Sequence, residues 1–243
     1  GQRIAAAIGL DASPAAFNPV ITDFYEQVGF LPEAIVNYMA LLGWSLDDKT
    51  EHFSIGELIG HFSLERVNKA PASFDCKKLM AFQEWHMNRV PAAQKAALVA
   101  PFLEKAGKVP TPMPAALAPR VEQVVAAAGD RIKTAGDILA FDEFFAPDDA
   151  FAYDATAFDK QLRKPGAAAL LAKHRAAVAA AEPFDAPTLD RLTHEFVARE
   201  GIKIGDLIHA LRVAVTGKSV GLGMFDAMAI LGRALEAAGF RVA

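Results

Sequence analysis

Residues 201–233 contain a helical pattern, a glycine-rich loop and then a second helical pattern. In the first pattern the apolar side chains recur three and four residues apart, which is the spacing of one face of an α-helix. These side chains are Ile204, Leu207, Ile208, Leu211 and Val215. Three glycines then fall within residues 217–223, and their backbone freedom disfavours a continuous helix. The stretch therefore predicts two packed helices joined by an open turn, from which Arg212 and Lys218 project.

The loop also contains a fragment of a nucleotide-binding pattern. Gly217-Lys218-Ser219 resembles the end of a phosphate-binding P-loop. That motif needs a glycine at the position of Arg212, and it follows a β-strand. Because the segment before this loop has helical spacing, the sequence disfavours a nucleotide-binding P-loop.

The composition indicates an all-α fold. Apolar residues make up 53% of the 243 residues, which is enough for a substantial core. Alanine, the strongest helix former, is frequent from residue 92 onward. No run alternates β-branched and polar residues between tight turns, as strands would. The lone Cys76 excludes an internal disulfide and fits a reducing cytoplasm, and no apolar run is long enough to cross a bilayer.

The charge distribution argues mildly against a general nucleic-acid binder but leaves room for a local basic patch. The net charge is −4, whereas compact nucleic-acid binders are often basic. Residues 199–243 nevertheless carry six Lys and Arg against four Asp and Glu, a local balance of +2. The six histidines are scattered without metal-ligand spacing, and no Ser-His-Asp, Cys-His or paired-carboxylate pattern indicates catalysis. We expect neither a metal site nor catalytic residues.

Prolines and capping residues divide the chain into helices. The expected helices are 21–28, 30–44, one opened by the capping box of Ser54, one capped by Asp75, 115–128, 134–144, 154–162, 166–181, 187–200 with Gly201 as its αL cap, and a last one ending at Gly239. The proline-punctuated segment 105–114 is the preferred boundary. We therefore expect a lead-in over 1–20, a first helical domain over 21–107 and a second over 115–243.

Three segments match a known family pattern in order. GFLPEAIVNYMALLGW and FSIGELIGHFSLERVNKAPASFDCKKL occupy residues 29–44 and 53–79. EFVAREGIKIGDLIHALRVAVTGKSVGLGMFDAMAILGR occupies residues 195–233. The first two resemble the bacterial-type glutamyl-tRNA synthetase just after its second ATP-binding signature, and the third resembles that family near its C-terminus. The resemblance covers roughly residues 20–232 and is weak over 90–131.

The resemblance implies a helical stem-contact segment followed by a helical-bundle anticodon-binding domain. The family's H-I-G-H-like motif and K-[LM]-S-K-R loop do not occur in this sequence. The chain therefore resembles the C-terminal, tRNA-binding portion of the enzyme, with the catalytic domain missing. In that family the whole enzyme attaches glutamate to tRNA-Glu with ATP and Mg, and this chain alone is expected to be inactive.

The resemblance also assigns residues to the anticodon. It implies that Arg212 faces the anticodon and that Gly221 and Met224 approach its bases. It matches Arg131 to an arginine that meets another anticodon position. Arginine suits this task because its planar guanidinium can both stack on a base and hydrogen-bond to it. For Arg212 the competing interpretation is an arginine that stabilises the C-terminal end of its own helix.

Four further basic residues are expected near the RNA backbone. Lys203 and Lys218 would attract phosphates, which positions an RNA without reading its sequence. Arg66 and Lys69 match a family segment near the acceptor side and D-stem of tRNA. Each of the four could equally be a solvated surface residue. The large aromatic side chains are expected in the core; they are Tyr38, Trp44 and Trp85.

Two rival functions remain at this point. The first is a catalytically silent helical adaptor that derives from the synthetase and binds RNA or protein. The second is a glutaminyl enzyme, which is disfavoured because its usual form has a β-barrel anticodon domain and nothing here is β-rich. The expected partners are tRNA-Glu and the missing catalytic domain, with no DNA and no membrane. We expect a cytoplasmic monomer.

Overall fold

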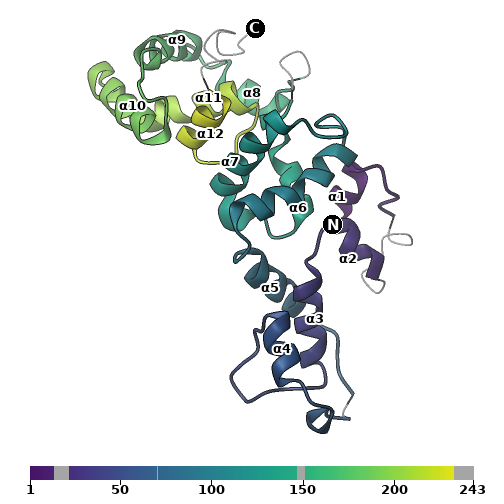
Figure 1. Ribbon diagram of the computed structural model, residues 1–243. Coiled ribbons are helices and arrows are strands. Elements are labelled where there is room, and N and C mark those ends of the chain that lie inside the picture. Colours follow the sequence, from purple (N-terminus) through teal and green to yellow (C-terminus); the bar gives the residue numbers. More distant parts are fainter. Residues whose placement is uncertain (14–21, 70, 147–150, 233–243) are drawn as a thin grey trace. The chain divides into compact units, whose positions relative to one another are not determined.

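The computed structural model of the chain describes residues 1–13, 22–69, 71–146 and 151–232 (Figure 1). Every regular element in these ranges is a helix, which confirms the predicted all-α fold. None of the described helices is long and apolar enough to cross a membrane. The predicted end of the last helix, at Gly239, lies outside the described residues.

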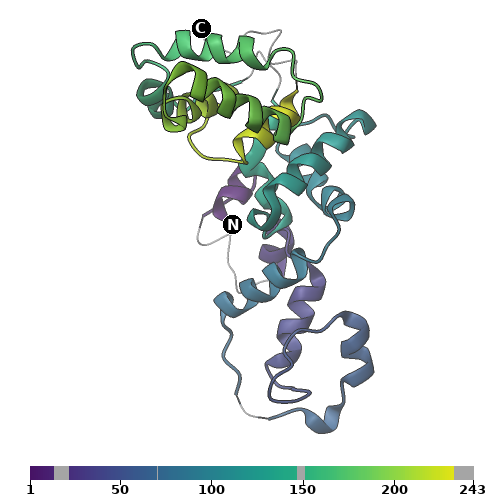
Figure 2. The ribbon, with the colours of Figure 1, turned by 90° about the vertical axis from the view of Figure 1, so that its left-hand side faces the viewer.

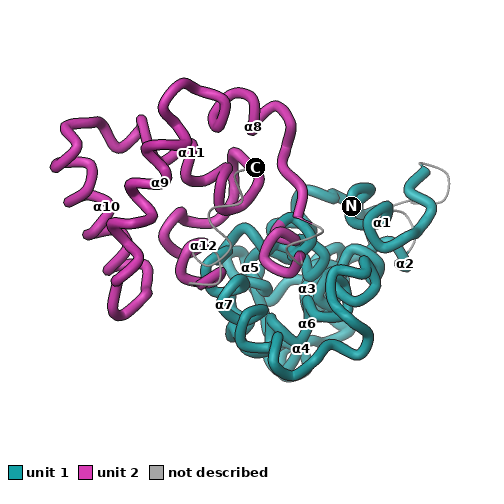
Figure 3. Tube along the Cα trace, turned by 90° about the horizontal axis from the view of Figure 1, so that it is seen from above, with its two compact units in different colours: residues 1–140 teal, residues 141–243 magenta. Residues whose placement is uncertain are grey.

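The chain divides into two compact units, Gly1–Ala140 and Phe141–Ala243 (Figure 3). The proline-punctuated segment 105–114 lies inside the first unit. It connects α6 (Ala92–Lys105) to α7 (Ala118–Ala128), and these two helices pack against each other. Compact packing therefore divides the chain at a different point from the proline pattern, and the domain limits at 107 and 115 stay predictions.

The described residues of the first unit form seven α-helices. Besides α6 and α7 they are α1 (Gln2–Ala7), α2 (Thr22–Val28), α3 (Pro32–Leu41), α4 (Ile55–His61) and α5 (Cys76–Met87), with short 3-10 helices η1 (Leu64–Arg66), η2 (Ala115–Leu117) and η3 (Gly129–Arg131). The predicted caps are confirmed. Ser54 and Glu57 form a reciprocal capping box at the start of α4. The Asp75 carboxylate accepts hydrogen bonds from the first N–H groups of α5.

The region expected to be a lead-in contains helix α1, and this helix packs into the first unit. Ile4 is buried. A Cβ atom on Gly136 would lie 2.6 Å from Ile4 Cγ2 and 2.8 Å from the Val28 carbonyl oxygen. The absence of a side chain at Gly136 thus lets α1 and the end of α2 approach the same backbone segment.

A buried glutamine joins distant parts of the first unit. Gln83, on α5, is fully buried. Its Oε1 accepts a hydrogen bond of 2.8 Å from the backbone N–H of Leu31, which precedes α3. Its Nε2 donates a hydrogen bond of 2.8 Å to the Lys133 carbonyl oxygen. Both ends of the amide are thereby satisfied, as burial of a polar group requires.

The predicted helix over 134–144 is a 3-10 helix, η4 (Ala135–Phe144), with a kink at Phe141. The physical reason is visible in its buried apolar side chains, which recur every three positions and so match three residues per turn. They are Ala135, Ile138, Phe141 and Phe144. The Asp137 carboxylate accepts a hydrogen bond of 2.8 Å from the Thr134 N–H, whereas the buried Thr134 hydroxyl has no partner.

The second unit is a helical bundle (Figures 1 and 2). Its helices are α8 (Ala155–Gln161), α9 (Ala167–Val178), α10 (Ala186–Glu200), α11 (Ile204–Thr216) and α12 (Met224–Leu231). α11 contacts all four of the others. Its buried residues include Leu207, Leu211 and Val215 of the predicted apolar stripe. The predicted αL cap at Gly201, with φ 66°, ends α10.

Candidate functional site

Arg212 lies on α11 and reaches the loop that follows the helix. Its side chain is half-buried, and its Nη1 donates a hydrogen bond of 2.6 Å to the Leu222 carbonyl oxygen. The guanidinium therefore connects the helix to the far end of the glycine-rich loop. Because α11 precedes this loop, the structure also excludes the strand that a P-loop would need.

The loop starts with a glycine that no other residue could replace without strain. Gly217 has φ 70°, in the left-handed region, and caps α11. A Cβ atom at this position would lie 2.6 Å from the Ala152 carbonyl oxygen. The Gly217 carbonyl accepts a hydrogen bond of 2.8 Å from the N–H of Asp154, the N-cap of α8. This close approach fixes where the loop leaves the helix.

Lys218 was predicted to project from the turn, but the structure places its ammonium group against two carboxylates. Lys218 Nζ lies 2.8 Å from Asp142 Oδ1 and 2.7 Å from Glu143 Oε2. The side chain of Glu143 is only 3% exposed, and those of Lys218 and Asp142 are 35% and 29% exposed. The ammonium is thus held by residues that are far away in sequence.

The pKa values in this cluster reflect burial and charge pairing. Burial raises the pKa of the Glu143 carboxyl above its ordinary value, and the nearby Lys218 ammonium only partly opposes this effect. Burial also acts to lower the pKa of Lys218, but its hydrogen bonds to Asp142 and Glu143, with their charges, outweigh burial and raise it. Lys218 is therefore firmly protonated, whereas Glu143 is ionised less readily than an exposed glutamate.

The second oxygen of the Glu143 carboxylate, Oε1, is buried and has no hydrogen-bond partner in the part of the chain that the structure describes. It lies near Gly221, because a Cβ atom on that glycine would be 3.6 Å from it. The same Cβ atom would be 4.0 Å from Arg212 Nη1. Gly221 thus lies between the buried carboxylate and the guanidinium, where a larger residue would meet both.

Met224 and Val220 differ from what the sequence suggested. Met224, predicted to approach anticodon bases, is the first residue of α12 and only 4% exposed, so its side chain packs in the bundle. Val220 was not singled out, yet it is 76% exposed within the loop. A β-branched residue within a glycine-rich loop is the sequence signal that could have identified it.

The remaining predicted residues lie at exposed positions. Lys203, before α11, is exposed, and its N–H donates a hydrogen bond of 2.9 Å to Asp206 Oδ2. Arg131, in the first unit, donates hydrogen bonds of 3.3 and 3.4 Å to the last carbonyls of α7, from Nε to Ala128 and from Nη2 to Ala127. The exposed side chains of Arg66 and Lys69 also belong to the first unit. The structure thus brings together Arg212, Lys218 and Gly221 of the predicted set.

Asp142 and Glu143 were missed by the sequence interpretation. They lie within η4, and in the sequence neither residue type differs from that of an ordinary surface carboxylate. The available signal was the repeat of buried apolar residues every three positions around them, which places Glu143 next to the buried Phe144. Their partner, Lys218, is 75 or 76 positions away and could not be identified from spacing.

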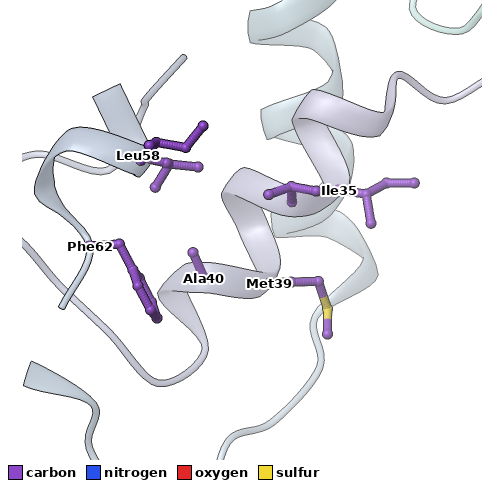
Figure 4. Close-up of a pocket in the computed structure, with 7 residues that line it drawn as sticks. Ile35, Met39, Ala40, Leu58 and Phe62 are labelled. Atoms are coloured by element: carbon purple, nitrogen blue, oxygen red, sulfur yellow. The ribbon is translucent and has the colours of Figure 1, made fainter. Parts of the chain in front are cut away.

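The first unit contains a different kind of surface feature, an apolar groove between α3 and α4 (Figure 4). Its volume is about 450 Å³. The lining residues are Ile35, Val36, Met39, Ala40, Leu58, Ile59 and Phe62. Because all of these side chains are apolar, the groove offers no group that would bind a phosphate or a base edge.

The aromatic residues predicted for the core divide into two groups. Tyr38 and Trp44 are buried. Trp85 is half-buried, with its ring stacked on His52 at 4.7 Å and the Arg89 guanidinium 3.5 Å from the ring centroid. Within the described ranges, no group of three or more His, Cys, Asp or Glu side chains is placed to hold a metal ion.

Comparison with known proteins gives matches over both units. Residues 94–236 match the family model of the anticodon binding domain, and residues 18–81 match that of the catalytic domain of class I tRNA synthetases for E and Q. The glutamate–tRNA ligase of Herpetosiphon aurantiacus is 36% identical over 214 residues, which is 88% of this chain and 43% of that protein. The ligase of Moorella thermoacetica is 36% identical over 209 residues, 86% of this chain and 42% of that protein. The chain thus spans less than half the length of these relatives.

Solved structures support the fold. A glutamate tRNA ligase from Elizabethkingia meningosepticum, crystallised with its amino acid, superposes with a TM-score of 0.75 at 24% identity. The superposed region covers 89% of this chain and 41% of the solved ligase chain. The family model of the anticodon binding domain matches more than half of the residues. The chain therefore belongs to the anticodon-binding domain family, and its curated relatives are glutamate–tRNA ligases.

Proposed function

We propose that this chain is the tRNA-binding portion of a class I glutamate–tRNA ligase and that it binds the anticodon and stem of tRNA-Glu. The family match over 94–236 and the ligase relatives support this proposal. The whole enzyme would use ATP and Mg to attach glutamate to the tRNA. The chain by itself would be a cytoplasmic monomer without aminoacylation activity. In the whole enzyme its partner would be the missing part of the catalytic domain. No specific observation favours the alternative of a silent adaptor.

The observation that carries the proposal is the half-buried guanidinium of Arg212 at the glycine-rich loop. Sequence-specific RNA recognition uses unstacked bases in loops, which need a planar or apolar surface and hydrogen-bond donors. Arg212, on α11, provides a planar group with hydrogen-bond donors. The exposed Val220 provides apolar surface in the loop that Arg212 contacts. The two requirements are thus met within a few residues of the chain.

The other predicted residues would have supporting roles in this proposal. Lys203, Arg66 and Lys69 are exposed and could attract phosphates, which orients the RNA. Arg131 is exposed and would contact a second anticodon position. Gly221 would leave space beside Arg212 for a base. The buried Met224 would support the loop from within the bundle.

The test is a titration of the chain with tRNA-Glu and with a non-cognate tRNA at two salt concentrations. We expect tighter binding of tRNA-Glu, weakened by salt because phosphate contacts release counterions. Arg212→Ala should weaken tRNA-Glu binding by roughly 10- to 100-fold, the range for loss of one base-reading arginine. The matched control is Arg191→Ala, which removes an exposed arginine paired with Glu195 on α10.

The control should reduce binding of both tRNAs by at most a few-fold. Equal affinity for the two tRNAs, unchanged by Arg212→Ala, would contradict the proposal. A separate assay of glutamate-dependent ATP–pyrophosphate exchange should show no activity for this chain alone. Exchange activity would contradict the assignment of catalysis to the whole enzyme.

A further inference from the structure

The cluster of Asp142, Glu143 and Lys218 is an unusual feature of the second unit. It pairs one ammonium group with two carboxylates at 2.7 and 2.8 Å. One of these carboxylates, Glu143, is almost completely buried. Burial of a charge is unfavourable unless good pairing and hydrogen bonding compensate for it. Since Glu143 Oε1 has no hydrogen-bond partner among the described residues, this compensation is incomplete.

Such a cluster is poorly explained by stability alone. Apolar residues of similar volume often replace a buried ion pair with no loss of stability. A buried polar atom without a partner is rare in folded proteins and requires a specific explanation. What an ion pair adds over an apolar contact is a defined geometry, because the ammonium must lie between the two carboxylates. The position of the cluster in the fold therefore indicates its role.

The cluster and Arg212 hold the two ends of the same short loop. Lys218 directly follows the helix cap Gly217 and is held by the carboxylates. Leu222, four residues later, accepts the hydrogen bond from Arg212. Between them lies Gly221, flanked by Glu143 Oε1 and Arg212 Nη1. A change in the position of Lys218 would therefore move the carbonyl that holds the guanidinium.

We propose that Asp142 and Glu143 are positioning residues: by binding Lys218 they fix the loop over 217–222 and hold the Arg212 guanidinium in the orientation that reads an RNA base. This inference rests on the proposed function. It assigns Lys218 the role of a partly buried structural cation and removes it from the set of phosphate contacts. Neither carboxylate touches the RNA, so both act through Arg212.

The salt dependence of RNA binding separates this role from a phosphate contact. If Lys218 neutralised a phosphate, Lys218→Met would weaken the binding of all tRNAs alike. It would also reduce the slope of the logarithm of the binding constant against the logarithm of the salt concentration by about one. If Lys218 positions the loop, Lys218→Met should leave the slope unchanged and reduce the preference for tRNA-Glu at least tenfold. Glu143→Gln, which keeps the shape of the side chain, should reduce this preference in the same way.

Two further variants serve as controls. Lys203→Met removes an exposed lysine at the start of α11, and we expect it to reduce the salt slope without changing the preference. Lys218→Arg keeps a cation between the carboxylates, and most of the preference should be retained. The fold of each variant is checked by hydrogen exchange of the α11 amides, whose protection should match that of the unsubstituted chain.

A measurement without RNA makes the outcome independent of the proposed function. Hydrogen exchange at residues 217–222 of the free chain should be at least tenfold faster in Lys218→Met and Glu143→Gln. Unchanged exchange there would overturn the inference, as would a uniform loss of affinity with a smaller salt slope. If the unsubstituted chain does not distinguish tRNA-Glu from a non-cognate tRNA, the proposed function fails while the exchange data still decide the inference.

Discussion

Gln83 in the first unit and Glu143 in the second are both buried polar residues that join segments far apart in sequence, yet they are satisfied differently. Both ends of the Gln83 amide are hydrogen-bonded, to Leu31 and to Lys133. Glu143 has one carboxylate oxygen on Lys218 and another without a partner. A fully satisfied neutral group is a stable structural link, whereas a partly satisfied charge is retained where geometry matters more than stability.

The surroundings of Gln83 and Glu143 also differ. Gln83 connects the start of α3 to the segment before η4, inside the core of the first unit. Glu143 contacts a loop that contains the exposed Val220 and that the half-buried Arg212 of α11 reaches with a hydrogen bond. A partly satisfied buried charge thus lies next to the candidate site, whereas the buried amide of Gln83 has both of its ends paired.

The largest expected effect is at Gln83. Gln83→Ala leaves the Leu31 N–H and the Lys133 carbonyl unpaired and opens a cavity, so we expect the free energy of unfolding to fall by about 4 kcal/mol. Both tryptophans, Trp44 and Trp85, belong to the first unit, so their fluorescence during urea unfolding reports on this unit. Gln94→Ala, at an exposed position of α6, is the control and should change little. If Gln83→Ala lowered the free energy of unfolding no more than the control does, the contrast between Gln83 and Glu143 would be wrong.

The next largest effect is an acid sensitivity of the second unit. His174 is fully buried, and burial lowers its pKa from 6.5 to about 4. Between these values the unfolded chain binds a proton that the folded chain does not, so stability is complete above pH 6.5 and decreases as the pH falls toward 4. The decrease amounts to about 3 kcal/mol.

Hydrogen exchange of the α9 amides as a function of pH measures this decrease. His174→Gln should remove most of the pH dependence, whereas His209→Gln, at an exposed position of α11, should retain it. The expectation fails if the unsubstituted chain and His174→Gln lose α9 protection in parallel between pH 6.5 and 4.

A smaller effect is expected at Glu143 itself. Burial raises its pKa, so the folded state favours the protonated form, and ionisation reduces stability as the pH rises through that pKa. Glu143→Gln removes this penalty together with the charge pairing to Lys218. We expect the two effects to offset each other to within about 1 kcal/mol at pH 7. Thermal unfolding of the second unit measures this, and a loss as large as that of Gln83→Ala would contradict the contrast between the residues.

The smallest effect is expected at Arg131, which is exposed and makes long hydrogen bonds to the end of α7. Arg131→Ala should change the free energy of unfolding by less than about 0.5 kcal/mol, as is usual for a surface substitution. In urea unfolding, Arg131→Lys should behave like the unsubstituted chain. A loss above about 2 kcal/mol for Arg131→Ala would show that the residue is structural, since surface positions rarely reach that value.

The sequence was sufficient to predict the helices where the signal is local. The Ser54 and Asp75 caps and the αL cap at Gly201 depend on neighbouring residues, and the structure confirms all three. The 3-10 character of η4 was also present, in the three-residue spacing from Ala135 to Phe144, but the helix expected over 134–144 was predicted without this distinction.

The candidate site could be predicted only in part. Arg212 and the glycines of the loop were identified from the pattern of residues 201–233 and from the family resemblance. The pairing of Lys218 with Asp142 and Glu143 could not be identified, because it depends on how η4 packs against α11 and its loop. For the same reason the sequence placed Met224 at the anticodon, whereas packing of α12 buries it.

The central claim is that the loop of the second unit reads anticodon bases through Arg212. The most direct measurement is the affinity of the chain for the anticodon stem-loop of tRNA-Glu and for hairpins in which each anticodon base is changed in turn. We predict at least tenfold weaker binding for one changed base, with this difference lost in Arg212→Ala. Equal affinities for all hairpins, with and without Arg212, would contradict the claim.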